Sequence, residues 1–80
     1  MTLARLRCTT TDAKAFRQQL DAYFETNSIQ INDIKIEQAE DGSTTYELEL
    51  RIGRDMTIND ITNFLGSMEG VQKISFEMEG

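Results

Sequence analysis

The stretch that decides the fold is residues 29–53, IQINDIKIEQAEDGSTTYELELRIG. A two-residue Asp-Gly turn in its middle would set Ile36 opposite Glu47 and place apolar side chains on opposite faces. A three-residue turn, Glu40-Asp41-Gly42 with a left-handed glycine, sets Ile36 opposite Tyr46 and gives one apolar face. The stretch therefore predicts a β-hairpin with the three-residue turn. The second strand alternates strictly, and its apolar positions are Tyr46, Leu48, Leu50 and Ile52.

The alternation of isoleucines in the first strand of this hairpin slips by one residue at Asn32-Asp33. One extra residue there, as in a β-bulge, sets Ile31 opposite Leu50 and Ile29 opposite Ile52. All the isoleucines of the strand would then share the core face. The alternative is a strand that begins only after the slip, with the earlier isoleucines packing from the connecting loop. The isoleucines concerned are Ile29, Ile31, Ile34 and Ile36.

Elements on either side of the hairpin complete the pattern. Residues 3–10 and 71–79 alternate as strands, and Ile74, Phe76 and Met78 of the last strand are expected to point inward. Residues 11–25 and 56–70 carry apolar side chains at helical intervals of three and four. Capping residues mark the helix ends: Asp12 and Thr57 are expected N-caps, Asp60 completes a capping box with Thr57, and Gly70 is expected to close the second helix.

The resulting order, βαββαβ, predicts an α+β ferredoxin-like sandwich. Right-handed crossovers give a four-stranded antiparallel sheet of strand order 4-1-3-2 with both helices on one face, as a single domain over residues 1–80. The second strand is then an edge strand, where bulges are over-represented, and this favours the bulge over the loop. The open face would carry Arg5 and Arg7, flanked by Glu47, Glu49 and Glu77.

Composition narrows the classes of function. The net charge of −6 argues against a nucleic-acid partner, and the absence of His removes imidazole catalysis and imidazole metal sites. One cysteine, Cys8, cannot form an internal disulfide and is expected to be buried and inert. No apolar run approaches the roughly 20 residues of a membrane span, and no signal peptide opens the chain. We expect a cytoplasmic, non-enzymatic domain without a cofactor.

The segment LGSMEGVQKISFE, with Gly70 and Val71 ahead of the last strand, resembles the ACT domain, as do the element order and the size. ACT domains that bind amino acids carry a glycine-containing segment after the first strand, where this chain has TTTDAKAF (residues 9–16). The chain is more similar to the C-terminal cytoplasmic domain of the MgtC/SapB family, in which the first strand runs directly into the helix and an acidic hairpin joins strands two and three. That resemblance implies a cytosolic tail of an inner-membrane protein linked to magnesium limitation.

Two groups of residues are candidate sites. A ligand at the first helix N-terminus would meet the polar residues of the strand–helix junction, although capping is the alternative role for them; these are Thr9, Thr10, Thr11 and Asp12. Carboxylates of the hairpin could supply oxygen ligands to Mg²⁺ or Ca²⁺, although they lack the spacing of a calcium loop; these are Glu37, Glu40 and Asp41.

These observations predict a non-catalytic regulatory or interaction domain of the MgtC/SapB type. Its expected partner is a second copy, in a homodimer, or the preceding membrane domain, and the segment itself does not insert into a membrane. The alternative is a free-standing ACT-type sensor of a small metabolite such as an amino acid. An acylphosphatase-like enzyme on the same topology is disfavoured, because no Gly/Arg-rich anion-binding loop lies near the first helix.

Overall fold

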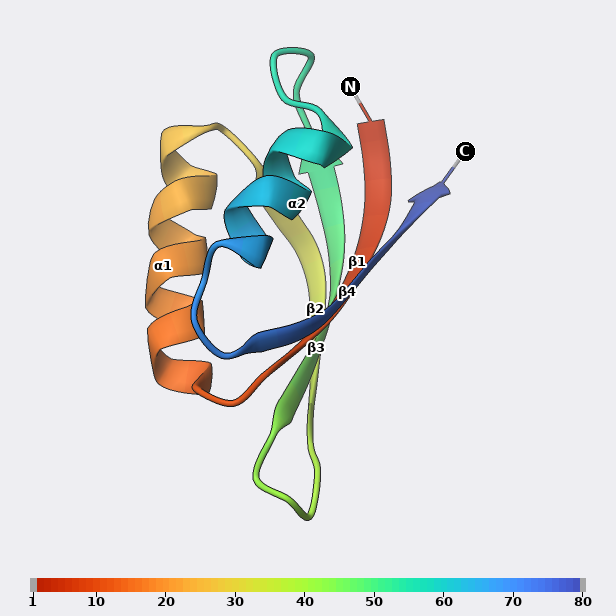
Figure 1. The fold of residues 1–80 in the computed structure, drawn as a ribbon. Helices are drawn as coiled ribbons and strands as arrows, with labels where there is room; N and C mark the ends of the chain where they lie inside the picture. Colours follow the sequence, from red (N-terminus) through yellow and green to blue (C-terminus); the bar gives the residue numbers. More distant parts are fainter. Residues whose placement is uncertain (1, 80) are drawn as a thin grey trace.

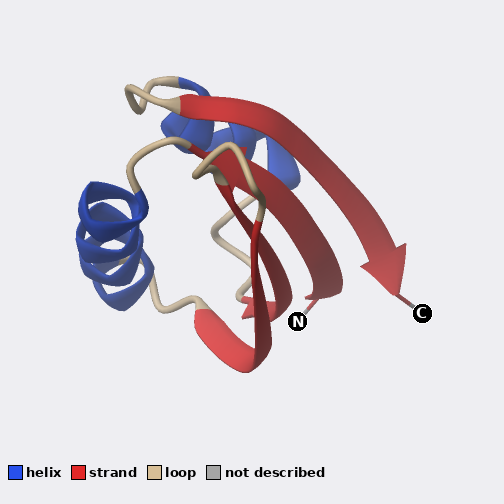
Figure 2. Ribbon diagram, turned by 90° about the horizontal axis from the view of Figure 1, so that it is seen from below, coloured by secondary structure: helices blue, strands red, loops and turns tan. Residues whose placement is uncertain are grey.

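The computed structural model describes residues 2–79, and Figure 1 shows their arrangement. The strands form one antiparallel sheet in the order β2-β3-β1-β4. Both helices cover the same face of the curved sheet and the other face is open (Figure 2). The predicted ferredoxin-like sandwich is confirmed, since this strand order is the expected one counted from the other edge. The elements are β1 (Thr2–Thr10), α1 (Ala13–Thr26), β2 (Gln30–Gln38), β3 (Thr44–Ile52), α2 (Ile58–Gly66) and β4 (Val71–Glu79).

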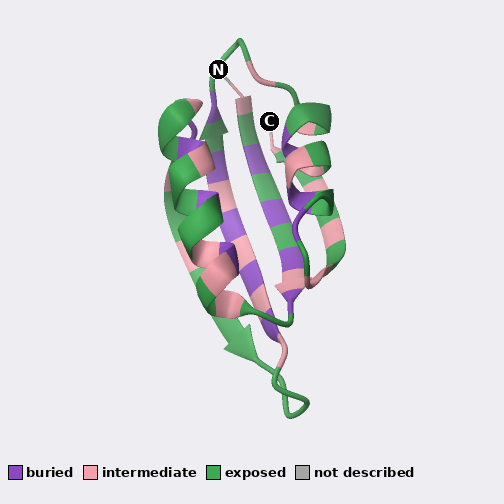
Figure 3. Ribbon diagram, turned by 60° about the vertical axis from the view of Figure 1, so that its left-hand side comes forward, coloured by how far each residue is buried: buried purple, intermediate pink, exposed green. Residues whose placement is uncertain are grey.

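The core lies between the sheet and the helices. Every second residue of β3, and of β1 from Ala4 onward, is buried, which gives both strands the striped pattern of Figure 3. The rings of Phe16 on α1 and Tyr46 on β3 lie 4.8 Å apart between centroids and tie the first helix to the sheet. Burying one such large apolar side chain contributes about 1.5–3 kcal/mol. The largest fully buried side chains include Phe16, Leu6, Leu20, Leu48, Leu50, Ile52, Ile61 and Leu65.

The hairpin between β2 and β3 has the predicted three-residue turn. The N–H of Ala39 donates to the carbonyl of Ser43 at 2.9 Å, which leaves residues 40–42 as the turn, and Gly42 has φ = 89°. Ile36 lies opposite Tyr46. The register that the apolar alternation predicts is therefore confirmed.

The β-bulge is confirmed as well. Ile31 lies opposite Leu50 and Asp33 lies opposite Glu49, so Asn32 is the extra residue. The strand begins at Gln30, one residue later than predicted. Ile29 precedes it and is only 6% exposed, with its N–H donating to the carbonyl of Phe24 at 2.9 Å. Ile29 thus fills the core from the end of the α1–β2 connection and does not pair with β3.

Two side chains predicted to lie in the core are exposed instead. Ile36 is 54% and Met78 61% exposed, although each lies on the helix side of its strand. Figure 1 shows why: the β2–β3 hairpin extends beyond the helices at one end of the sheet, and the last residues of β4 diverge from them at the other. Alternation assigns a residue to a face, but the helices are shorter than the strands and leave both ends uncovered.

The second helix begins as predicted and ends earlier. Asp60 N–H donates to the Thr57 hydroxyl at 3.1 Å and Thr57 N–H donates to the Asp60 carboxylate at 3.0 Å, which completes the capping box. The helix ends at Gly66, so Gly70 does not close it. Gly70, with φ = 88°, instead forms the turn into β4. Neither helix in residues 2–79 is long and apolar enough to cross a bilayer.

Deleting single residues tests the bulge. Deletion of Asn32 should change the free energy of unfolding by less than about 1 kcal/mol, because it leaves a regular strand with every isoleucine on its present face. Deletion of Gln30 should cost about 2–3 kcal/mol, because Ile29 would move to the outward position opposite Arg51. Urea unfolding monitored by circular dichroism measures both. Equal losses in the two variants would contradict the bulge.

Candidate functional site

The junction between β1 and α1 brings together the predicted ligand-binding residues, and two of them are engaged within the sheet and turn. The hydroxyls of Thr9 and Thr45 lie 2.9 Å apart across the β1–β3 ladder. Thr10 is 1% exposed, and its hydroxyl accepts the N–H of Asp12 at 3.1 Å. The Asp12 carboxylate in turn accepts the N–H of Ala15 at 3.1 Å and caps the helix. All three side chains therefore hold the connection between strand and helix.

Gly70 closes the junction from the β4 side. The N–H of Thr11 donates to the Gly70 carbonyl at 2.9 Å, and the Thr11 hydroxyl lies 3.5 Å from the same oxygen. A Cβ on Gly70 would come within 2.7 Å of the Thr11 hydroxyl oxygen. The two segments are thus in direct contact. The four side chains thus make hydrogen bonds within the sheet, the turn, the helix cap and the contact with Gly70, and a ligand there remains a prediction.

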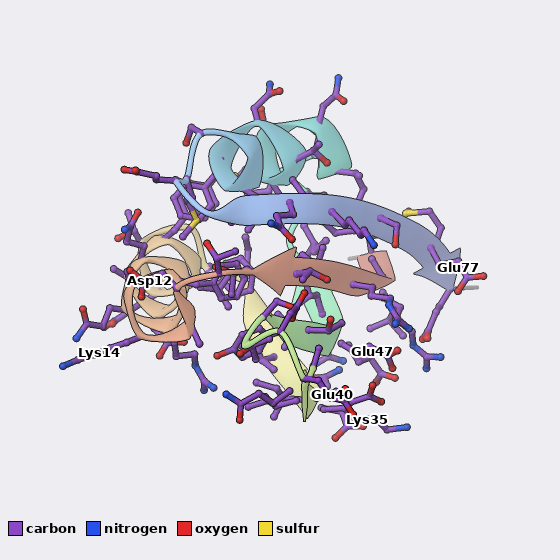
Figure 4. All side chains as sticks on the ribbon, turned by 60° about the horizontal axis from the view of Figure 1, so that its bottom comes forward. Asp12, Lys14, Lys35, Glu40, Glu47 and Glu77 are labelled. Atoms are coloured by element: carbon purple, nitrogen blue, oxygen red, sulfur yellow. The ribbon has the colours of Figure 1, made fainter. Side chains whose placement is uncertain are left out.

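The three predicted metal ligands lie along the β2–β3 hairpin. Asp41 accepts hydrogen bonds from the Ser43 hydroxyl at 2.7 Å and from the Ser43 N–H at 2.9 Å, and these bonds lower the pKa of the Asp41 carboxyl. Glu37 lies on the open face opposite Thr45, whereas Figure 4 shows Glu40 at the hairpin. Within residues 2–79 no three acidic or cysteine side chains are grouped so that they could hold a metal ion.

Arginines of β1 form ion pairs across the open face of the sheet. Arg7 lies 2.7 Å from Glu47, and Arg5 lies 3.0 Å from Glu79 and 3.8 Å from Glu49. The expected flanking residue Glu77 lies opposite Arg5 in register, but the ion pair on that side is formed by Glu79. Because these pairs are exposed, each contributes little to stability. The open face therefore carries paired charges of both signs that are exposed to solvent.

A shallow hollow beside Ser75 interrupts this open face. Ser75 is a small residue between larger side chains, which is the only sequence signal for the hollow. The charged side chains that line the hollow are Lys73 and Arg7, and Arg7 is already paired with Glu47. Such a surface can accommodate a small polar group but encloses none. The hollow measures about 390 Å³ and is lined by Arg7, Cys8, Thr9, Thr45, Lys73, Ile74 and Ser75.

The outer surface of the helices carries a second, more apolar hollow that the sequence pattern does not indicate. Tyr23 of α1 and Phe64 of α2 stack with ring centroids 3.8 Å apart and planes 5° from parallel. Burial raises the pKa of Tyr23, and the negative charge of Asp60 adds to the effect. Half-exposed stacked rings of this kind suit contact with another protein surface. The hollow, about 350 Å³, is lined by Gln19, Ala22, Tyr23, Thr26, Asn27 and Phe64.

Cys8 is buried as predicted. Its side chain points into the core from β1, is 1% exposed, and has its pKa raised to about 12 by that burial. A thiol with this pKa carries almost no thiolate at neutral pH, and the thiolate is the reactive form. Cys8 therefore packs as a small apolar residue.

Thiol labelling tests this assignment. At pH 8 the folded protein should react with Ellman's reagent more than about a hundredfold more slowly than the urea-unfolded chain, because the folded thiol is both covered and protonated. The raised pKa also means that stability falls as pH rises from 9.0, the ordinary value, towards about 12. Cys8→Val should show a smaller decline over that range. Rapid labelling under native conditions would contradict the buried assignment.

Two glycine variants measure the contact between β4 and the junction. Gly42 and Gly70 have similar positive φ values, 89° and 88°, but a Cβ meets nothing within 4 Å at Gly42. Gly42→Ala should therefore cost only the backbone strain, about 1 kcal/mol, and Gly70→Ala about 2–3 kcal/mol. Thermal unfolding compares them. Combining Gly70→Ala with Thr11→Ala should recover the difference, and identical losses in the two single variants would exclude the close contact.

Comparison with known proteins identifies the fold. No family model and no curated protein matches the sequence. Among solved structures, the C-terminal domain of the MgtC protein from Mycobacterium tuberculosis matches with a TM-score of 0.79 at 14% identity, over 99% of this chain and 88% of that chain. An ACT domain protein from Streptococcus pneumoniae matches with a TM-score of 0.73 at 14% identity, over 96% and 89% of the two chains. The de novo design Ferredog-Diesel matches with a TM-score of 0.52 at 19% identity, over 94% and 83%. The fold is ACT-like.

Proposed function

We propose that this ACT-like domain is a non-catalytic regulatory or interaction module, and that it forms the cytoplasmic C-terminal domain of an MgtC/SapB-type membrane protein linked to magnesium homeostasis. The observation that carries the proposal is the likeness to the mycobacterial MgtC domain over nearly the whole chain. It agrees with the sequence resemblance, which rests on the direct passage from the first strand into the first helix.

The closed junction supports an interaction module over a metabolite sensor. In an ACT-type sensor the segment after the first strand receives the ligand, but here Thr10, Thr11 and Asp12 make hydrogen bonds inside the junction. Gly70 lies against Thr11 at a distance that leaves no space between the two segments. A ligand would have to displace these contacts before it could bind. Recognition through an outer surface requires no such rearrangement.

The helix surface is the part of the domain best suited to meet a preceding membrane domain. The open sheet face is charged and solvated, whereas the hollow at Tyr23 and Phe64 is mainly apolar. Aromatic side chains are enriched at the centres of protein interfaces and contribute a large share of their affinity. We therefore assign the contact with the membrane part to this hollow.

Cell fractionation tests the membrane assignment. An antibody against this domain should detect a protein much larger than 9.1 kDa in the membrane fraction of the source cells, released by detergent and not by high salt. Protease added to inverted membrane vesicles should remove the epitope, because the domain would face the cytoplasm. A 9.1 kDa antigen in the supernatant would overturn the membrane assignment.

Ligand titration tests the sensor alternative. Backbone amide shifts of the ¹⁵N-labelled domain should show no saturable change at residues 9–16 with any amino acid, because the junction is closed by its own hydrogen bonds. Mg²⁺ should likewise cause no saturable amide shift at residues 37–41. Saturable shifts at residues 9–16 would favour the metabolite sensor, and saturable Mg²⁺ shifts at residues 37–41 would establish a metal site on the hairpin.

A further inference from the structure

The two edges of the sheet differ in how they are protected. An edge strand offers unpaired N–H and C=O groups to any other strand, and bulges and charges are the usual protection. β2 carries the bulge at Asn32, which interrupts its ladder near the middle of the domain. β4 is nine residues long, contains no proline, and within residues 2–79 pairs only with β1. Its only irregularity lies at its first residues, opposite Thr9 and Thr10.

The sequence of β4, VQKISFEME, is complementary to itself in the antiparallel direction. We propose that β4 pairs with β4 of a second copy of this chain, with the two-fold axis at Ser75. Residues 73–77 of the two copies then form a regular ladder, and the irregularity near Val71 lies outside it. Opposite residues of an antiparallel pair lie on the same face, so each copy keeps its helix side and its open side. The two sheets become one continuous sheet.

Charge selects this register. Lys73 lies opposite Glu77 of the second copy, and the two-fold axis repeats the pair. Both side chains are exposed, and neither forms an ion pair within residues 2–79, whereas Arg5 and Arg7 do. Shifting the centre to Ile74 would set Lys73 against Ser75 and leave the charges without partners. Figure 4 shows Glu77 on β4, at the sheet edge remote from Lys35 of β2.

The helix side of the same register is apolar. Ile74 and Phe76 are half-buried and pack against the core, and each lies opposite the other across the two-fold axis. Directly opposite side chains in an antiparallel pair have Cβ atoms about 4.5–5.5 Å apart, so both residues would lose their remaining contact with water. Charge on one face and apolar contact on the other thus support the same alignment.

This surface goes beyond the proposed function. It lies on the sheet edge, whereas the contact assigned to the membrane domain lies on the helix surface at Tyr23 and Phe64. Its test measures molecular mass and not cellular location. Self-association and membrane attachment can therefore fail independently of one another.

Sedimentation equilibrium of the 80-residue chain tests the pairing. The chain should show a concentration-dependent dimer. Lys73→Glu should weaken the dimer about tenfold or more, because two attractive pairs become repulsive. The double variant Lys73→Glu/Glu77→Lys should return its dissociation constant to within about threefold of the original, because the charges are exchanged and remain opposite. Lys35→Glu, an equivalent change on the β2 edge, should leave the dimer unchanged.

Three results would overturn the proposal. One is a monomer at every concentration up to about 1 mM, where even weak specific contacts are populated. Another is a double variant as weak as Lys73→Glu, since the charges would then not face one another. The third is an equal loss in Lys35→Glu, which would place the contact elsewhere or make it a general effect of net charge.

A cysteine at the two-fold axis gives a second measurement that does not depend on affinity. Ser75→Cys would face its own copy at a separation that a disulfide can bridge, and Cys8 is buried and does not compete. Mild oxidation should cross-link this variant at least about tenfold faster than Lys35→Cys on the opposite edge. Equal rates for the two variants would exclude β4 as the interface.

Discussion

The pairing of β1 with β3 on one side and β4 on the other is the constraint on which the rest of the structure depends. Leu6 lies opposite both Leu48 and Phe76, so one apolar side chain of β1 connects both neighbouring strands beneath the helices. Because side chains alternate along a strand, burying Leu6 also places Arg5 and Arg7 on the open face. The charged face and the core thus follow from a single register, and a slip of one residue would invert both.

The same register explains why the junction between β1 and α1 is closed. Since β1 runs directly into α1, its last residues lie beside the start of β4, where Thr11 meets Gly70. The polar groups of the junction take part in helix capping and in backbone hydrogen bonds, which an ordered helix N-terminus needs in any case. What remains available to partners is the outer surface.

Sequence periodicity predicted the features that depend on the alternation of side chains. It failed for features that depend on the lengths of the helices and on how the helices pack on the sheet. The bulge at Asn32 followed from the phase of the isoleucines and the turn, and Asp12 was correctly predicted as the N-cap of the first helix. The exposure of Ile36 and Met78 was missed, because alternation does not reveal how far a helix extends over a strand. The stack of Tyr23 on Phe64 was missed for a related reason: each helix shows its own apolar stripe, but their mutual distance depends on how both pack on the sheet.

The protection of the sheet edges matters particularly in a domain of this size. A chain of about 80 residues buries only about 60% of the surface that its unfolded form exposes, so its stability is small and additional burial matters. A bulge protects β2 by interrupting its ladder. From Lys73 onward β4 retains a regular ladder with β1, and Ile74 and Phe76 lie on its helix side. The net charge of −6 repels another copy in most orientations. An alignment that brings Lys73 to Glu77 of the second copy offsets part of that repulsion, so the proposed contact depends on this one register.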